Sequence, residues 1–377
     1  MKTAIIHDWI MSMRGGERCL EVFCELFPQA DLFTMVHKKG IASDTIENMS
    51  ITTSFIQKLP FSMTKYRHFL PIFPNAIQSF KLEDYDLVLS SSHCVAKGIK
   101  KPKNAIHICY CYTPVRYAWF FFDEYFGKEN FIKRKLISMT VKRLKEWDLK
   151  TNKDVDYFIS ISDNVRNRIA RVYNRDSDVI YPPVDVEQFS ASKTSEDFYL
   201  IVSALVPYKR IDLAIEAFNK TGKRLIIVGT GNSEKDLRKI AKPNIELLGY
   251  ASDDKIKDLY ARCRALIFPG EEDFGIVPVE AQACGKPVIA YGKGGALETI
   301  IPLNADKSTN YELITNNYPS GVFFYEQTTG ALIEAIEVFE QNIQKFIPDE
   351  IRKNSLRFSR NMFKQNIKQF IDDKLEG

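Results

Sequence analysis

The sequence lacks three features that would place a protein in a special class. It has no run of the roughly 18 apolar residues that a membrane-spanning helix needs. Its seven cysteines are odd in number and include no Cys-x-x-Cys pair, which argues against a disulfide framework and favours a reducing compartment. A net charge of only +4 does not point to nucleic acid, but it permits contact with anionic lipid or phosphate-bearing substrates.

The remaining composition is that of an ordinary soluble globular protein, with 45% hydrophobic and 27% charged residues. A chain of 377 residues is long enough for two domains with separate cores. The apolar run near the N-terminus is too short for a signal peptide. We therefore expect a cytoplasmic protein, with peripheral contact with the inner face of a membrane as an option.

The second half of the chain alternates strand and helix patterns. Strands are expected at 198–203, 224–228, 245–248, 265–268 and 288–291, with helices between them. This alternation predicts an α/β fold with a doubly wound parallel sheet, which binds ligands at the carboxyl ends of its strands. Turn residues and a proline pair after Asn174 predict a linker, so the domains are expected at 1–174 and 175–354. An amphipathic helix is expected over 355–377.

The most informative stretch, Pro269 to Cys284, reads PGEEDFGIVPVEAQAC and follows a predicted buried strand. Glu272 lies in the loop after that strand, and Glu280 lies eight residues later in a predicted helix. The free amides at a helix start suit a phosphate, and flanking carboxylates suit sugar hydroxyls. A phosphate between two sugars is a nucleotide-sugar. The same acids also fit an acidic surface loop.

Other candidate residues follow predicted strands. Lys209 and Arg210 precede a helix, where two cations are placed to neutralise a pyrophosphate or to form a solvated basic pair. His93 follows a strand expected at 85–90, at the edge where parallel sheets bind ligands, although a lone histidine is usually structural. Near the N-terminus, strand, Gly15-Gly16 and helix suggest a phosphate-binding layout, or a loop that simply needs glycine dihedrals.

One further segment is basic. Residues 128–145 carry seven basic residues against one acid, and the apolar positions are too loosely spaced for a clean amphipathic stripe. The segment is compatible with a pyrophosphate-bearing lipid, with the inner membrane leaflet, or with a solvated helix face. The two Asp-x-Asp triplets lie at strand starts, so we expect no metal site.

The segment EEDFGIVPVEAQACGKPVIA resembles the signature of the family-4 glycosyltransferases. These are retaining enzymes of GT-B architecture, in which two facing Rossmann-like domains hold the active cleft and a C-terminal helix returns to the first domain. The resemblance implies that Glu272 approaches the donor sugar and that Glu280 binds ribose hydroxyls. It also implies that His93, in SSSHCVAKG, contacts the sugar and that the Gly15-Gly16 pair lies near the donor phosphates.

The resemblance implies further site residues. The expected catalytic residues are Glu272, His93, Lys209 and Arg210. The expected donor-binding residues are Gly15, Gly16, Lys209, Arg210, Gly249, Tyr250, Phe274, Gly275, Ile276, Val277 and Glu280. CYTPVRYAW is similar to the family's CHTPMRYLW, so Tyr112 stands where histidine is common, and Arg14, Tyr112, Arg116 and Tyr117 are expected on the acceptor side. Ala204 stands where relatives commonly carry arginine.

The segments HDW, SSSH and VPYKRIDLAIEAF are similar to those of bacterial mannosyltransferases of surface-polysaccharide assembly. This similarity implies GDP-mannose as the donor, a lipid-linked glycan as the acceptor, and no cofactor. A UDP-hexose donor and a non-catalytic protein that binds a nucleotide-sugar remain as alternatives.

Overall fold

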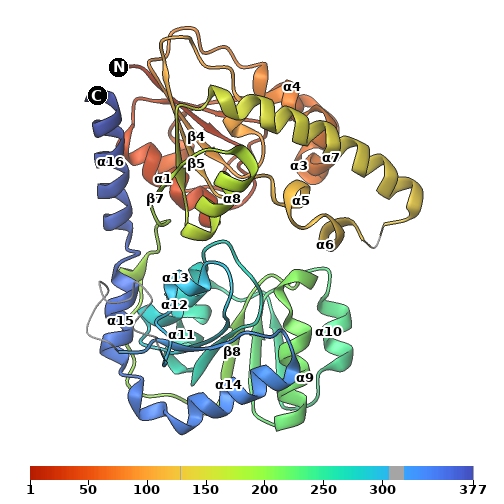
Figure 1. Cartoon of the computed structure of the whole chain (residues 1–377), viewed down its shortest axis with the longest axis vertical. Helices are drawn as coiled ribbons and strands as arrows, with labels where there is room; N and C mark the ends of the chain where they lie inside the picture. The colour runs from red at the N-terminus through yellow and green to blue at the C-terminus, as the bar shows by residue number, and fades with distance from the viewer. Residues whose placement is uncertain (128, 305–317, 377) are drawn as a thin grey trace. The chain divides into compact units, whose positions relative to one another are not determined.

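A computed structural model describes residues 1–127, 129–304 and 318–376, which form two compact units (Figure 1). Unit 1 comprises Met1–Pro183 and Phe363–Gly377, and unit 2 comprises Val184–Met362. The boundary between the units lies at Pro183–Val184, later in the chain than the boundary predicted at Asn174. The short strand β7 (Asp178–Val179) pairs with β6 (Tyr157–Ser160), and this pairing keeps the residues after Asn174 with unit 1.

Unit 1 is built on a seven-stranded sheet with the order β3-β2-β1-β4-β5-β6-β7, and every pairing in it is parallel. Its remaining strands are β1 (Thr3–His7), β2 (Asp31–Thr34), β3 (Ser50–Thr53), β4 (Leu87–Ser92) and β5 (Ile106–Cys111). Its helices are α1 (Gly15–Leu26), α2 (Asp44–Glu47), α3 (Ser62–Lys65), α4 (Phe73–Gln78), α5 (Arg116–Trp119), α6 (Phe122–Phe126), α7 (Phe131–Thr151), α8 (Asp163–Tyr173) and the returning α16 (Arg360–Glu376).

Unit 2 is built on a six-stranded parallel sheet with the order β10-β9-β8-β11-β12-β13. Its strands are β8 (Tyr199–Val202), β9 (Leu225–Val228), β10 (Ile245–Gly249), β11 (Ala265–Phe268), β12 (Val288–Tyr291) and β13 (Gly321–Phe324). Its helices are α9 (Ile211–Thr221), α10 (Glu234–Ile240), α11 (Asp253–Arg262), α12 (Ile276–Ala283), α13 (Ala296–Thr299), α14 (Thr329–Gln341) and α15 (Pro348–Leu356). The 3₁₀ helices include η3 (Ala96–Gly98) in unit 1 and η6 (Pro207–Lys209) in unit 2.

Helices cover both faces of each sheet, which confirms the predicted doubly wound fold. In unit 1, Phe363 of α16 packs against Phe23 of α1 and Tyr110 of β5, with ring centroids 5.9 and 5.4 Å apart. Val141 and Leu144 of α7 join the core on the other face. Because both faces are covered, central strands such as β1, β9 and β11 are buried along their length rather than alternating.

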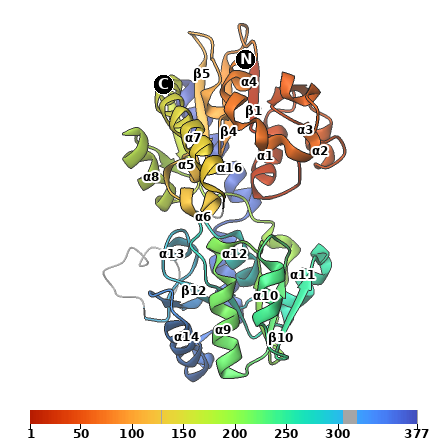
Figure 2. The same ribbon diagram turned by 90° about the vertical axis from the view of Figure 1, so that its right-hand side faces the viewer.

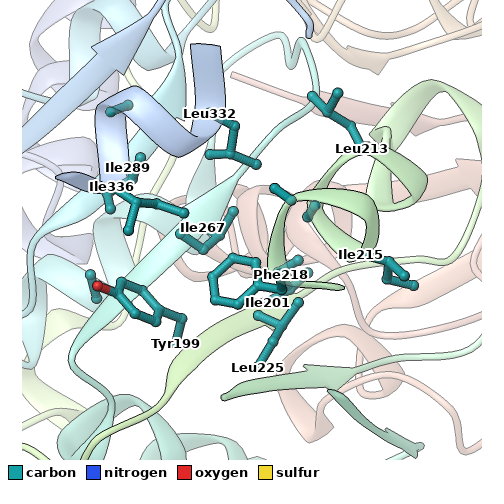
Figure 3. Packing of buried hydrophobic residues seen from close by; sticks show 14 of the residues in the cluster. Tyr199, Ile201, Leu213, Ile215, Phe218, Leu225, Ile267, Ile289, Leu332 and Ile336 are labelled. Atoms are coloured by element: carbon teal, nitrogen blue, oxygen red, sulfur yellow. The ribbon is translucent and has the colours of Figure 1, made fainter. Parts of the chain in front are cut away.

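In the core of unit 2, helix side chains likewise pack against the sheet (Figure 3). Phe218 of α9 and Ile336 of α14 are fully buried in one cluster with Ile201 and Ile267 of the sheet. Full burial of one such side chain contributes about 1.5–3 kcal/mol. This rigid packing fixes the loops that leave the carboxyl ends of the strands.

The C-terminal segment differs from the prediction of one helix over 355–377. The chain forms α15 and α16 instead, and it is interrupted around Phe358. Phe358 is buried against Phe274, with ring centroids 5.4 Å apart, and its carbonyl accepts a hydrogen bond from the Val184 amide at 2.8 Å. An isolated parallel β-bridge between Val184 and Ser359 lies at this break. Beyond the break, α16 packs on unit 1, as expected.

The strand orders create one topological switch point in each unit. β1 lies beside β4 in unit 1, and β8 lies beside β11 in unit 2. Strands are added outward in opposite directions from each of these pairs, so their carboxyl-end loops diverge and leave a crevice. Ligand-binding residues are therefore expected at these two places.

Candidate active site

The switch point of unit 2 joins two of the predicted residues. Lys209 ends η6 in the segment after β8, and Glu272 lies in the loop after β11. The Lys209 ammonium forms an ion pair with the Glu272 carboxylate, and the two side chains are only 17% and 18% exposed. Sixty-three positions separate them in the sequence, and only the β8–β11 pairing brings them together.

Glycine allows these backbones to approach. A Cβ on Gly270 would lie 2.9 Å from Lys209 Cα, so the two loops touch through backbone. A Cβ on Gly294 or Gly295 would lie 2.3 Å from Glu272 O or Phe274 Cα, respectively. The Gly295 amide donates a hydrogen bond to Glu272 O at 2.9 Å. The Gly294–Gly295 turn thus supports the Glu272 loop from its other side.

This supporting turn was missed by sequence reasoning. Lys293, just before the glycines, forms an ion pair with Glu271 at 3.1 Å. A signal was present, because Lys293-Gly294-Gly295 closely follows β12, the strand next to β11 in the sheet. Glycines after the carboxyl end of a neighbouring parallel strand are expected at the same ligand edge.

Helix α12 begins within the predicted donor site. Gly275 is its N-cap and has a φ of +105°, a conformation that favours glycine. The partly exposed Ile276 and Val277 form the first turn, followed by the buried Pro278. Proline is well suited to the first turn because its missing N–H would have no intrahelical acceptor. The first amides and the positive end of the helix dipole favour an anion here.

Glu280 lies one turn further along α12 and has a fixed position. The Tyr260 hydroxyl of α11 donates a hydrogen bond to Glu280 Oε2 at 3.0 Å. Tyr260 is fully buried, and burial together with the nearby Glu280 raises its pKa well above the usual value. Tyr260 therefore remains a hydrogen-bond donor at neutral pH. No spacing in the sequence indicated this partner.

The other predicted donor residues differ in their surroundings. Arg210 has a left-handed backbone, with a φ of +53°, and its Nε lies 3.3 Å from both carboxylate oxygens of Asp212. Phe274 is 97% buried and packs on Phe358, which indicates a structural role. Gly249 ends β10 with a φ of +72°, and Tyr250 is 85% exposed. No contact brings these last two residues to Glu272 within the described part of the chain.

The switch point of unit 1 is organised by a buried carboxylate, Asp8, which sequence reasoning did not single out. Asp8 follows β1 and is completely buried. Its Oδ2 accepts the amides of His93 and Cys94 at 2.8 and 2.9 Å, and its Oδ1 accepts those of Val95 and Ala96 at 2.7 and 2.8 Å. Asp8 Oδ2 also lies 3.2 Å from Nδ1 of His93. Asp8 thus fixes both the backbone and the ring of the predicted His93.

A second hydrogen-bond chain lies beside it. Nδ1 of the buried His7 lies 3.0 Å from Ser91 Oγ, which in turn lies 2.8 Å from the Tyr112 hydroxyl. The Tyr112 hydroxyl donates to Gly16 O at 2.9 Å. Burial and the neighbouring His93 lower the pKa of His7 to about 3, so His7 is neutral at physiological pH. The chain ties the ends of β1, β4 and β5 to the start of α1.

Gly15 and Gly16 form the first turn of α1 and not a loop before it. Their amides are therefore at a helix N-terminus, where intrahelical acceptors are absent. The amide of the preceding Arg14 donates to the Glu17 side chain at 3.1 Å. The Arg14 side chain is exposed.

The predicted acceptor-side residues of α5 pack within unit 1. The Arg116 guanidinium lies over the Phe121 ring, 4.5 Å from its centroid. The Tyr117 hydroxyl lies 3.1 Å from Cys94 Sγ, and burial raises the pKa of Tyr117 well above its usual value. Of the four acceptor-side residues, Tyr112 is the one whose ring pairs with His93, at a centroid distance of 6.1 Å.

Within residues 1–127, 129–304 and 318–376, no three His, Cys, Asp or Glu side chains gather as a metal site would require. Among the helices in the same ranges, none is both long and apolar enough to cross a membrane.

Comparisons with known proteins converge on one class of enzyme. Residues 185–365 match the family model for glycosyl transferases group 1. The chain is 27% identical to the O-antigen chain mannosyltransferase RfbU of Salmonella typhimurium over 342 residues, covering 86% of each chain. It is 25% identical to the alpha-1,3/1,6-mannosyltransferase ALG2 of Kluyveromyces lactis over 343 residues, covering 76% of this chain and 65% of the relative.

A solved structure with the same fold is that of Anabaena Alr3699/HepE in complex with UDP-glucose. The TM-score is 0.66 at 16% identity, and the match covers 99% of this chain and 100% of that one. This likeness supports the GT-B fold that was predicted from the sequence.

Proposed function

We propose, from the premise that this chain is a GT-B glycosyltransferase with a group 1 domain over residues 185–365, that it transfers mannose from GDP-mannose to a hydroxyl of a lipid-linked glycan. The observation that carries the proposal is the Lys209–Glu272 ion pair at the switch point of unit 2. It places a cation and a carboxylate next to the start of α12, where an anion is favoured.

The assignment of mannose is supported by the two mannosyltransferases to which the chain is similar, RfbU and ALG2. Because RfbU is an O-antigen chain mannosyltransferase, the similarity to it also supports a role in O-antigen or related polysaccharide assembly. HepE, whose structure contains UDP-glucose, supports a UDP-hexose as the second candidate donor.

The proposed chemistry is displacement of a diphosphate from the anomeric carbon. The bond between that carbon and the phosphate oxygen breaks, and the acceptor oxygen forms the new bond on the same face of the sugar, so that configuration is retained. The departing phosphate accepts the proton of the acceptor hydroxyl. Lys209 and the first amides of α12 stabilise the developing negative charge.

The two carboxylates have different proposed roles. Glu272 neutralises Lys209 within the protein, and a bound diphosphate competes for that cation and frees Glu272 to accept hydrogen bonds from the sugar. Glu280, fixed by Tyr260 at 3.0 Å, accepts hydrogen bonds from the ribose hydroxyls. Arg210 pairs with Asp212 of its own segment, whereas Lys209 pairs with the Glu272 loop that leads into α12, so Arg210 contributes less to phosphate binding than Lys209.

Unit 1 supplies the group that orients the sugar in this proposal. Asp8 holds Nδ1 of His93 at 3.2 Å and thereby directs the other ring nitrogen away from itself. His93 remains 32% exposed, so it is accessible to a ligand. The reaction as proposed needs no metal and no cofactor. A lipid-linked acceptor brings the enzyme to the inner face of the membrane.

The test is an assay of diphosphate release from a panel of nucleotide-sugars, with and without a lipid-linked acceptor. We expect GDP release from GDP-mannose that increases when the acceptor is present. The Lys209→Ala variant should lose this activity, whereas Lys242→Ala, an exposed lysine of the same unit, should keep it. Tight nucleotide binding without turnover of any donor would contradict the proposal and indicate a binding protein.

A further inference from the structure

Helix α7 carries apolar side chains on two different sides. On the inner side, Val141 and Leu144 are buried in the core of unit 1, Ile137 packs against that core, and Asp148 is completely buried. These positions follow the spacing i, i+4, i+7, i+11, which places them on one side of a helix. This inner side anchors α7 to the unit.

A second apolar row begins five residues earlier and repeats the spacing. Ile132, Leu136 and Met139 are 72%, 61% and 52% exposed, and Phe131 at the start of the helix is 81% exposed. A shift of five residues turns the row by about 140° around the helix, away from the core. Figure 1 shows the first turns of α7 extending beyond the other helices of unit 1, and Figure 2 shows the helix from a second direction.

Exposed cations surround this second row. Met139 has Lys135 four residues before it, and Lys142 and Arg143 three and four residues after it, which are the neighbouring positions on a helix surface. Lys133 and Arg134 have carboxylate partners in Glu129 and Asp123. Within the described part of the chain, no carboxylate lies within ion-pair distance of Lys135, Lys142 or Arg143.

We propose that this outer face of α7 rests on an anionic lipid surface. The outer face consists of Phe131, Ile132, Lys135, Leu136, Met139, Lys142 and Arg143. Its apolar side chains enter the boundary between headgroups and acyl chains, and its cations contact lipid phosphates. A patch of exposed large apolar residues indicates an interaction surface. A protein partner fits less well, because the core of a protein interface is depleted in lysine.

The inference deepens the proposed function. Its biological role, keeping the enzyme near a lipid-linked acceptor, rests on that function, whereas membrane binding itself does not depend on it. The outer face explains how an enzyme with no membrane-crossing helix among its described residues remains near such an acceptor. The outer face belongs to unit 1 and shares no residue with the proposed donor site, which is built from residues of unit 2. Vesicle binding therefore tests the outer face, and sugar transfer tests the proposed function, independently of each other.

The experiment measures binding of the full chain to vesicles by flotation. One set of vesicles contains phosphatidylcholine alone, and the other contains phosphatidylcholine mixed with phosphatidylglycerol. We expect binding to the second set only, weakening as salt rises, because ions screen exposed charges. Each cation of the outer face is expected to contribute roughly fivefold to the affinity.

Two variants test the outer face separately. The apolar variant combines Ile132→Ser, Leu136→Ser and Met139→Ser, and the charge variant combines Lys135→Glu, Lys142→Glu and Arg143→Glu. We expect the apolar variant to bind at least about tenfold more weakly and the charge variant to lose binding. A matched control, Ile240→Ser with Ile343→Ser and Leu356→Ser, changes unit 2 side chains that are 42–43% exposed and should bind like the parent.

Binding that is equal for neutral and anionic vesicles, or unchanged in both variants, would overturn the inference. A self-associated species in solution that the apolar variant dissociates, with no vesicle binding by the parent, would also overturn it in favour of a second copy. Both variants should release GDP from GDP-mannose at the parent rate with a detergent-dispersed acceptor. Vesicle binding without any donor turnover would contradict the proposed function alone.

Discussion

The two switch points share one topology and solve different problems. In unit 1, the carboxylate of Asp8 occupies the amides of the turn after β4, so the protein supplies its own anion there. In unit 2, helix α12 begins at Gly275, which has no side chain to cap its amides. The first switch point is therefore a rigid holder for His93. The second is suited to an anion that arrives with the substrate.

The two units also differ in their histidine content. All five histidines of the chain lie in unit 1, and two of them, His7 and His107, are completely buried. Unit 2 uses Lys209 and glycine-rich turns instead. The difference teaches that one sheet architecture can hold either a preformed hydrogen-bond network or an adaptable charge site, according to which residues follow the strands.

The largest expected effect is on the charge site of unit 2. Replacing Lys209 by alanine, or Glu272 by alanine, should lower kcat about 10²–10³-fold, because loss of one preorganised charge-stabilising group costs about 2.7–4 kcal/mol in the barrier. Steady-state kinetics with the best donor would measure the loss. Arg210→Ala is the matched comparison and should lose clearly less, since its guanidinium pairs with Asp212 of its own segment and not with the Glu272 loop. Parent rates for both Lys209→Ala and Glu272→Ala would refute the role of this site.

The next largest effect is expected on the stability of unit 1, where Asp8 fixes His93. In Asp8→Asn, one acceptor oxygen becomes an NH₂ donor that faces backbone amides, and the charge-assisted bonds are lost. We expect unit 1 to lose about 3 kcal/mol of unfolding free energy, which urea denaturation would measure. A matched control is Asp44→Asn, an exposed residue of α2 in the same unit. Equal stability of the Asp8→Asn and Asp44→Asn variants would remove Asp8 from its organising role.

The sequence predicted one switch point better than the other for a physical reason. Strands 265–268 and 288–291 were predicted with their observed bounds, because each is a continuous apolar run. Glu272 and Lys209 were chosen because charged residues after buried strands are visible in the sequence. Asp8 was missed because its partners are backbone amides of residues 93–96, and a backbone amide is the same in almost every residue.

The missed elements have the same explanation. β7 has only two residues, and β3 reads SITT with its polar positions partly exposed, so neither shows the continuous apolar run that marks β11 and β12. The places of β3 and β7 are set by pairing with their neighbours β2 and β6. The break between α15 and α16 was missed because it depends on the distant Val184.

The two units should also differ in how their stability depends on pH, and we expect an effect of intermediate size. Burial lowers the pKa of His7 to about 3 and that of His107 to about 4, whereas both are near 6.5 when unfolded. The unfolded state therefore binds more protons, and unit 1 loses stability as the pH falls below 6.5. The slope is up to about 1.4 kcal/mol per pH unit for each histidine.

Burial raises the pKa of Glu17, so Glu17 stabilises unit 1 as the pH falls. This single carboxyl group opposes the two histidines. Hydrogen exchange with mass spectrometry, corrected for intrinsic rates, would follow β1, β4 and β5 separately from β8, β9 and β11. We expect the opening free energy of the first group to fall between pH 6.5 and 5 while the second group stays level. Equal changes in both groups would contradict the assignment of buried neutral histidines to unit 1.

The smallest expected effect concerns backbone approach. In Gly270→Ala, the new Cβ would lie 2.9 Å from Lys209 Cα and 3.0 Å from Lys209 O, so backbone must shift. We expect unit 2 to lose about 1–3 kcal/mol and the donor affinity to fall with it, as thermal denaturation and calorimetry would measure. Gly330→Ala is the control, because its Cβ would meet no described atom within 4 Å. Identical behaviour of the two variants would show that the Lys209 and Glu272 loops tolerate separation.

The most direct test of the central claim is a crystal structure of the protein with GDP bound. The account predicts the diphosphate within hydrogen-bonding distance of Lys209 Nζ and the first amides of α12, with a ribose hydroxyl on the Glu280 carboxylate. A nucleotide bound away from the β8–β11 switch point, with Lys209 still paired to Glu272 and Glu280 far from any ribose, would contradict it.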